Sequence, residues 1–266
     1  MTMNVKVNTV RIKDNEMNYI VLGSGKKNFV IIPGLSIHSV MGLVEAIAEA
    51  YKDFNTAYTV YLFDRAKNIS EGYSVRDMAK DTVEAMKALN IENADIFGAS
   101  QGGMIAEYIA IDYPKLVNKM VLGSTLSKPN DTSRKVIGNW IKLAKEKEET
   151  KLLESFVDDV YSQNTLEIYR DYLIDSNKGI TDKEYERFII LASACEKFNC
   201  YDELKNIKCP TLVLGSLDDK VVTVEGSKEI AEVVNCDIYL YDDNYGHGVY
   251  DEANDYKQRI LAFFQG

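Results

Sequence analysis

Residues 96–103 read IFGASQGG, an apolar run followed by a serine between small residues and then two glycines. Gly98, Ser100 and Gly102 fit the pattern G-x-S-x-G. Where such a pattern joins a strand to a helix, the neighbours of the serine must be small, because larger side chains would clash with both elements. The turn then holds the serine in strained, open backbone geometry. The alternative is a glycine-rich turn in which Ser100 only caps the following helix.

The segments around this turn alternate between strand-like and helix-like patterns. Apolar runs rich in β-branched residues stand at 28–34 (NFVIIPG), 58–64 (YTVYLFD), 94–100 and 117–124. Helical spacing follows at 40–54, 74–90 and 101–114, and Ser74 with Asp77 predicts a capped start. Two alternating segments before them, joined at residues 13–15, predict a hairpin. We therefore expect an α/β fold with a mostly parallel central sheet and helices on both faces.

The alternation stops between residues 126 and 206, where every segment has the pattern of a helix. Strand-like sequence resumes at 208–219 (KCPTLVLGSLDD), and a final helix is expected over 248–265. The sequence thus predicts a core formed by residues 1–125 and 207–266, with an all-helical cap inserted at 126–206.

Composition excludes several classes of function. The chain has 266 residues, 46% hydrophobic and 27% charged, and a formal net charge of −10, which disfavours nucleic acid and anionic membranes as partners. No apolar run is long enough for a membrane span, and the polar N-terminus is unlike a signal peptide. The four cysteines and two histidines lack the spacing of a zinc site, so we expect no metal, reduced thiols and a cytoplasmic protein. The oligomeric state is not encoded in any pattern that we recognise.

A serine needs a base to act as a nucleophile, and only His38 and His247 are present. Both follow strand ends, and the order along the chain favours His247. A carboxylate must orient the base, and Asp218 and Asp219 in LVLGSLDDKVV stand directly after a predicted strand. An acidic pair after a strand is also ordinary turn chemistry.

The same reaction needs amides that stabilise an oxyanion. The backbone amide of Gln101 is one candidate. The amide of Leu35 is the other, because Gly34 allows the chain to bend close to the serine. Ser36 could add a hydrogen bond there or could be a solvated turn residue.

The chain resembles the α/β-hydrolase fold superfamily over nearly its whole length. The resemblance rests on IIPGLS as the oxyanion loop, GASQGG as the nucleophile elbow, the helical insertion, GSLDD and YGHG. It implies Ser100 as nucleophile, His247 as base and Leu35 with Gln101 as oxyanion donors. The family's G-x-x-D pattern implies Asp218 as the acid, with Asp219 in reserve. Pro33 replaces a common histidine, and the sequence after Asp64-Arg65 lacks the family's glycine-rich turn.

The resemblance implies a serine hydrolase that cleaves an ester or related acyl bond of a small-molecule substrate without a cofactor. Perhydrolase or haloperoxidase-like chemistry and carbon–carbon bond hydrolysis on the same residues are alternatives, as is a slow-turnover ligand-binding regulator. In relatives the insertion roofs the site, so cap aromatics are candidates for the substrate pocket, although most such residues only hold a cap together. The candidates are Trp140, Phe156 and Phe188, together with Ser36.

Overall fold

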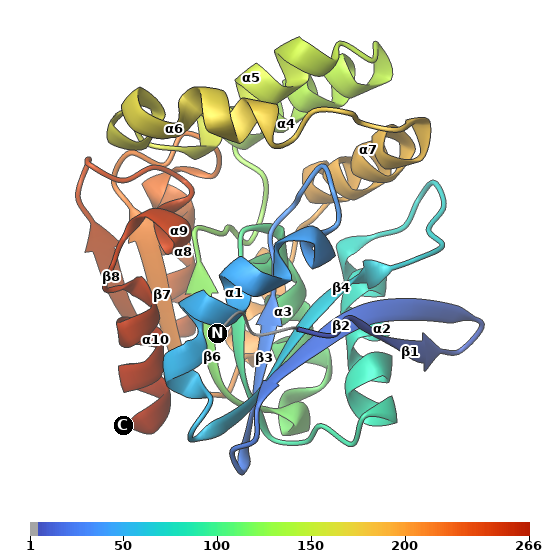
Figure 1. Ribbon diagram of the computed structural model, residues 1–266. Coiled ribbons are helices and arrows are strands. Elements are labelled where there is room, and N and C mark those ends of the chain that lie inside the picture. Colours follow the sequence, from blue (N-terminus) through green and yellow to red (C-terminus); the bar gives the residue numbers. More distant parts are fainter. Residues whose placement is uncertain (1–4) are drawn as a thin grey trace.

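The computed structural model describes residues 5–266, whose strands form one eight-stranded sheet in the order β1-β2-β4-β3-β5-β6-β7-β8 (Figure 1). The first two strands form the predicted hairpin, and β2 also pairs antiparallel with β4. The remaining neighbours pair in parallel. The strands are β1 (Asn8–Ile12), β2 (Asn15–Gly23), β3 (Lys27–Ile32), β4 (Tyr58–Ala66), β5 (Ala94–Ala99), β6 (Val117–Gly123), β7 (Thr211–Ser216) and β8 (Asp237–Tyr241).

Helices cover both faces of this sheet, which confirms the predicted mostly parallel α/β class. Every residue of β5 is buried, as expected of a central parallel strand covered on two sides. One hydrophobic cluster contains residues of α2, α3 and α8, and a second contains residues of α1 and α10 on the opposite face. The helices of the two layers are α1 (Val44–Ala50), α2 (Val75–Ala88), α3 (Gln101–Asp112), α8 (Thr223–Val234), α9 (Val249–Glu252) and α10 (Tyr256–Gln265).

Local sequence explains where several of these elements begin and end. Ser74 and Asp77 form the predicted capping box at the start of α2. The segment 40–54, predicted as one helix, instead divides into a 3₁₀ turn, α1 and a second 3₁₀ turn. The predicted closing helix is likewise interrupted, because Ala253 adopts an extended conformation with φ −84° and ψ 122°. Hydrophobic spacing continued across both breaks, so periodicity alone did not reveal them.

Between β6 and β7 the chain forms α4 (Asp131–Lys145), α5 (Glu149–Val160), α6 (Gln163–Asp175) and α7 (Asp182–Glu196). We call these four the cap helices. Figure 1 shows them gathered over the end of the sheet where the parallel strands finish. Helix α4 packs mainly against α7, and α5 packs against both α4 and α6. The division into a core of 1–125 and 207–266 and a cap of 126–206 stays a prediction.

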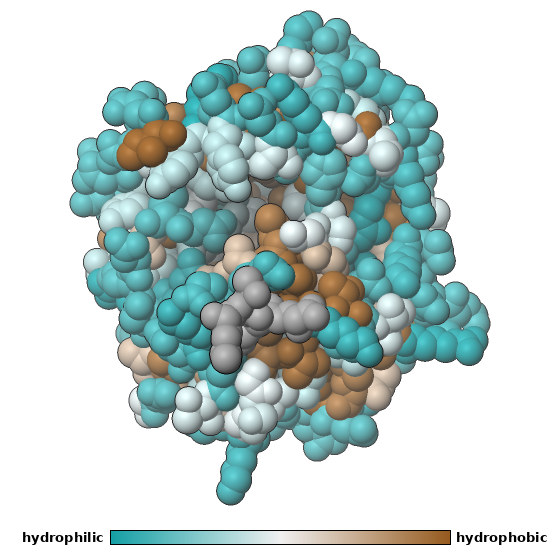
Figure 2. All heavy atoms as spheres, in the orientation of Figure 1, coloured by the Kyte–Doolittle hydropathy of each residue, from teal (hydrophilic) through white to brown (hydrophobic). Residues whose placement is uncertain are grey.

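The visible face of the molecule is mostly hydrophilic, and hydrophobic residues gather over its middle, below the cap helices (Figure 2). Within residues 5–266, no helix has both the length and the apolar composition that a bilayer crossing requires.

Candidate active site

The parallel strands end along one edge of the sheet, and Ser100 lies there at the junction of β5 and α3. Its backbone adopts φ 52° and ψ −120°, a conformation that side-chain-bearing residues rarely take. The Ser100 amide donates to the Gly123 carbonyl at 2.8 Å, and the Thr125 hydroxyl donates to the Ser100 carbonyl at 2.8 Å. Contacts to the end of β6 therefore hold this strained turn in place.

The glycines of the turn allow two backbones to approach closely. A Cβ added at Gly98 would lie 2.3 Å from the Gly102 carbonyl oxygen, and one at Gly102 would lie 2.0 Å from that of Ile32. Neither distance is compatible with a side chain. The glycines are thus required by the close packing of β5, α3 and the end of β3, as the sequence pattern indicated.

Ser100, His247 and an aspartate form a continuous hydrogen-bonded series. His247 Nε2 lies 3.0 Å from Ser100 Oγ, and His247 Nδ1 lies 2.9 Å from Asp219 Oδ2. The side chains of His247 and Asp219 are 3% and 2% exposed, so water hardly screens their interaction.

The prediction of Asp218 as the carboxylate partner is wrong, because Asp219 contacts the histidine. Asp219 Oδ1 accepts hydrogen bonds of 2.9 Å from the amides of Val221 and Val222, which turn its carboxylate inward. The Asp218 side chain is 41% exposed and lies 3.6 Å from Lys220 Nζ. Asp218 still belongs to the turn that follows β7, whereas Asp219 lies just beyond it, so a shift of one position exchanges a buried carboxylate for a solvated one.

The loop that carries His247 is held by both the sheet and the cap. The Ser216 hydroxyl at the end of β7 donates to the carbonyl of Tyr245. The Gly246 amide donates to Glu252 Oε2 at 2.7 Å, and the Gly248 amide donates to the carbonyl of Val160, the last residue of α5, at 2.7 Å. The position of the imidazole is therefore set from two sides.

The two candidate oxyanion amides lie on segments that face Ser100. A Cβ added at Gly34 would lie 3.3 Å from the Ser100 Cβ, so the loop after β3 passes directly beside the serine. Gln101 is the first residue of α3, and such an amide has no partner within its own helix. Among residues 5–266, the Leu35 amide donates to no protein backbone acceptor. A role of these amides as an oxyanion hole stays a prediction.

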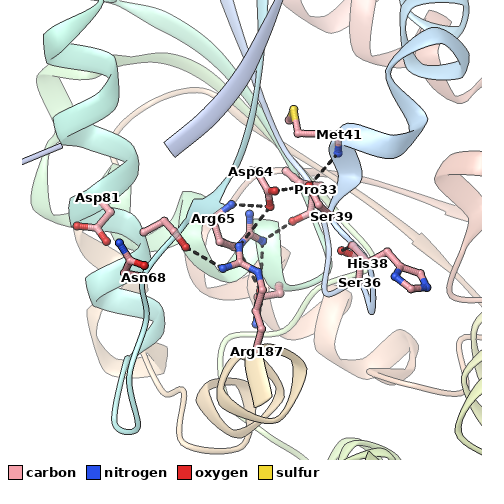
Figure 3. Close-up of polar contacts among 12 residues, drawn as sticks. Pro33, Ser36, His38, Ser39, Met41, Asp64, Arg65, Asn68, Asp81 and Arg187 are labelled. Atoms are coloured by element: carbon pink, nitrogen blue, oxygen red, sulfur yellow. Dashed lines mark hydrogen bonds and ion pairs between the residues drawn. The ribbon is translucent and has the colours of Figure 1, made fainter. Parts of the chain in front are cut away.

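His38, the alternative base, lies in a different environment from His247. Its Nδ1 is 2.7 Å from Glu184 Oε1, and its Nε2 is 2.8 Å from the Asn177 carbonyl oxygen. Glu184 lies on α7, and Asn177 lies in the connection between α6 and α7. Figure 3 shows its ring beside Ser36, whose hydroxyl donates to the His38 carbonyl at 2.7 Å. Ser36 thus makes the local contact expected of a turn residue.

The predicted pocket aromatics pack on one another. Trp140 and Phe156 have ring centroids 4.7 Å apart, and Phe156 and Phe188 have centroids 6.2 Å apart. Trp140 Nε1 donates to Asp159 Oδ2 at 2.9 Å, which satisfies its polar atom. These contacts account for the packing of the three rings without a substrate, and their role in a pocket stays a prediction.

Two buried polar residues beside the site were not among the residues predicted to form it. Arg65, at the end of β4, contacts both Pro33 and Gln101, and Thr125 holds the Ser100 carbonyl. No group of three His, Cys, Asp or Glu side chains in the described part of the chain is arranged to hold a metal ion.

Comparison with known proteins agrees with this fold. A family model described as alpha/beta hydrolase fold matches residues 27–254. The protein named "Putative carbamate hydrolase RutD" of Caulobacter sp. (strain K31) is 24% identical over 190 residues, covering 66% of this chain and 68% of that protein. The crystal structure of MGS-M2, an α/β hydrolase enzyme from a Medee basin deep-sea metagenome library, superposes with a TM-score of 0.87 at 21% identity, covering 97% of this chain and 98% of that one. The chain therefore belongs to the α/β hydrolase fold family.

Proposed function

We propose that this α/β hydrolase cleaves an ester or related acyl bond of a small molecule through an acyl-enzyme, with Ser100, His247 and Asp219 as its catalytic triad. The observation that carries the proposal is the series of two contacts, 3.0 Å from Ser100 Oγ to His247 Nε2 and 2.9 Å from His247 Nδ1 to Asp219 Oδ2. Both distances fall within hydrogen-bond reach, as a nucleophile, its base and the group that orients the base require.

In the first half of the reaction, Ser100 Oγ attacks the substrate carbonyl carbon while His247 Nε2 takes the hydroxyl proton. The carbonyl oxygen gains a negative charge, which the amides of Leu35 and Gln101 stabilise. The intermediate collapses, the bond to the leaving group breaks, and His247 returns the proton to that group. In the second half, water attacks the acyl-enzyme by the same route and releases the acid and free Ser100.

Asp219 holds the imidazole in the orientation and tautomer that this sequence of proton transfers needs. Burial alone would raise the pKa of Asp219, but the nearby His247 and the amides of Val222 and Val221 outweigh it and lower that pKa. The carboxylate is thus ionised when it accepts from His247 Nδ1, and it favours the imidazolium that forms when Ser100 gives up its proton.

The choice of an acyl bond draws support from the names of similar proteins. Besides the RutD protein, the structural neighbours include an esterase from Thermogutta terrifontis and an enol-lactonase from Burkholderia xenovorans. Perhydrolysis is the second candidate, because a neighbour from Bacillus anthracis is named a bromoperoxidase. The free thiols of Cys195, Cys200, Cys209 and Cys236 agree with the cytoplasmic location that we also propose.

The test compares Ser100→Ala with the wild type on p-nitrophenyl esters of graded acyl length, with and without hydrogen peroxide. We expect loss of about 10⁴-fold or more in kcat, because removal of a triad nucleophile leaves only the oxyanion hole and binding. Ser24→Ala is the matched control, because Ser24 is exposed in the turn before β3, at the opposite end of the sheet.

A fluorophosphonate probe should label the wild type and Ser24→Ala but not Ser100→Ala. Undiminished ester hydrolysis by Ser100→Ala would contradict the assignment of Ser100 as the nucleophile. Strong labelling of the wild type with negligible turnover on every ester would instead favour a ligand-binding regulator. Turnover that requires peroxide would favour perhydrolysis.

A further inference from the structure

We propose that Arg65 is a positioning residue that holds the two oxyanion-donating segments, the loop after β3 and the start of α3, at a fixed distance and places a positive charge behind them. The inference rests on the proposed function. It assigns a role in the reaction to a residue that does not itself reach the reacting atoms.

Arg65 joins these two segments directly. Its Nη2 donates to the Pro33 carbonyl oxygen at 2.6 Å, and its Nη2 and Nε donate to Gln101 Oε1 at 3.2 Å and 3.3 Å. Pro33 lies one peptide unit before the one that carries the Leu35 amide, and Gln101 carries the other candidate amide. One planar guanidinium therefore sets the spacing between both donors.

The side chain of Gln101 is fixed on its other side by the cap. Its Nε2 donates to the Leu191 carbonyl oxygen at 2.8 Å and to Cys195 Sγ at 3.1 Å, both on α7. Gln101 is only 1% exposed. Because both ends of its amide are occupied, the first turn of α3 cannot rotate without breaking contacts to β4 and to α7.

Arg65 is a buried cation whose hydrogen-bond acceptors are uncharged. It is 5% exposed, and its side-chain donors within residues 5–266 reach only a backbone carbonyl and a side-chain amide. The neighbouring Asp64 carboxylate is used elsewhere: it accepts from the Arg65 backbone amide at 2.7 Å and from Ser39, and lies 3.5 Å from Arg187 Nη2 of α7 (Figure 3).

Burial lowers the pKa of Arg65 to about 10, which still leaves the guanidinium charged at neutral pH. The Asp64 charge partly offsets burial but forms no ion pair with the guanidinium. Keeping such a cation in a dry interior is costly, and an uncharged residue could fill the same space more cheaply. A negative charge that develops on the substrate at the two amides would interact favourably with this cation. The uncharged carbonyl of the bound substrate would interact much less, so the charge favours the transition state.

A purely structural Arg65 would predict a different kinetic pattern. It would change how much protein folds and how the cap sits, and so would alter the fraction of active enzyme or KM. A positioning role alters stabilisation of the oxyanion, and so lowers kcat and the affinity for molecules that mimic the tetrahedral intermediate.

The experiment compares Arg65→Met, Arg65→Lys and Gln101→Met with the wild type. Arg76→Met is the matched control, since Arg76 binds Asp112 and Glu203 on the surface and touches no residue of the site. For each we measure kcat and KM for the best ester, normalised to sites titrated with a fluorophosphonate. We also measure the inhibition constant of a trifluoromethyl ketone, to whose carbonyl carbon Ser100 Oγ adds while its proton passes to His247, leaving an oxyanion.

We expect Arg65→Met to lower kcat per active site by about 10- to 100-fold, below the 10²- to 10³-fold loss seen when an oxyanion donor is removed outright. Affinity for the trifluoromethyl ketone should fall by a similar factor while KM stays within about threefold. Arg65→Lys should lose less, because it keeps the charge but not the second contact. Arg76→Met should match the wild type.

Two results would overturn the proposal: an unchanged kcat per titrated site in Arg65→Met, or a rise in KM without loss of ketone affinity. If Arg65→Met does not fold, Arg65→Lys and Gln101→Met are combined in a double-mutant cycle, in which a shared contact predicts a loss smaller than the product of the two. Failure of the triad assignment would appear separately, as activity retained by Ser100→Ala.

Discussion

The sheet edge and the cap helices above it differ in how narrowly each residue is constrained. At the edge, Ser100 has a positive φ of 52°, and a side chain at Gly102 would meet backbone at 2.0 Å. In the cap, Trp140, Phe156 and Phe188 pack on one another as any helical core does. Positions at the sheet edge accept one residue type, so the type of reaction can be inferred from the sequence there. Positions in the cap helices accept many apolar residues, so the sequence there says little about the substrate.

The largest expected effect comes from the sheet edge, where Asp219→Asn is compared with its neighbour Asp218→Asn. In Asp219→Asn, the amide cannot hold His247 in the tautomer that accepts the serine proton, and we expect kcat to fall by about 10⁴-fold. Asp218→Asn should stay within about twofold of the wild type, since its side chain is 41% exposed and pairs with the solvent-facing Lys220. Steady-state ester hydrolysis measures both.

Thermal unfolding of the two variants serves as the control, so that a loss of folded protein is not read as a loss of chemistry. Comparable losses of kcat in both variants would mean that catalysis depends on the turn after β7 as a whole and not on the Asp219 carboxylate alone. A greater loss of kcat in Asp218→Asn would favour Asp218 as the acid, as the G-x-x-D pattern implies.

The sequence was most informative where backbone geometry restricts residue type. The alternating segments predicted the parallel sheet, and the glycines around Ser100 predicted the sharp turn that the structure contains. The choice between Asp218 and Asp219 was not predictable, because it depends on which way the turn directs each carboxylate. Asp64-Arg65 was noted as part of the family pattern, but the contacts of Arg65 were not predictable, because its partners Pro33 and Gln101 are far from it in sequence. The break near Ala253 leaves the hydrophobic spacing intact.

The second comparison uses two glycines, Gly102 at the sheet edge and Gly138 in the middle of α4. A Cβ in Gly102→Ala would meet the Ile32 carbonyl oxygen at 2.0 Å, so backbone must move. We expect a loss of about 3 kcal/mol in the free energy of unfolding, at the upper end for overpacking. In Gly138→Ala the nearest atom is Glu196 Oε1 at 3.2 Å, the end of a flexible side chain. Alanine should therefore stabilise that helix by about 0.5–1 kcal/mol.

Urea unfolding of both variants, followed by circular dichroism, measures these free energies. Ester hydrolysis should fall only in Gly102→Ala, because the displaced Ile32 carries the loop that bears Leu35. A destabilised Gly138→Ala would show that the cap is as tightly constrained as the sheet edge, and would break the comparison.

The smallest expected effect concerns His38, which joins the two regions. Both of its ring nitrogens face acceptors, Glu184 Oε1 at 2.7 Å and the Asn177 carbonyl at 2.8 Å, and only the protonated ring can donate to both. Burial alone would lower the pKa of His38, but its bonds to Glu184 and Asn177 and the charges of Glu184 and Glu149 outweigh burial and raise it. The pKa of Glu184 is correspondingly lowered to about 2.

A raised histidine pKa stabilises the folded state below the ordinary value of 6.5 and stops doing so as the pH rises through the folded value. A glutamate whose pKa is lowered on folding stabilises the folded state above its ordinary value of 4.5. This stabilisation is lost only as the pH falls toward 2. The contact between His38 and the cap is thus strongest between these two ordinary values. His38→Gln should cost unfolding free energy at about pH 6 and cost less at about pH 9, as urea unfolding at both pH values measures.

Hydrogen exchange of residues 177–184 at the same two pH values locates the effect, because the wild type should open there more readily at about pH 9. Lys178→Gln is the control, since Lys178 forms an exposed pair with Asp175, and the hydrogen bond to Asp175 raises the pKa of Lys178 above its ordinary value of 10.5. A difference between His38→Gln and the wild type that stays constant or grows with pH would mean that His38 is neutral in the folded protein. The cap would then be held to the sheet edge only by contacts that pH does not affect, such as those of Gln101 with α7.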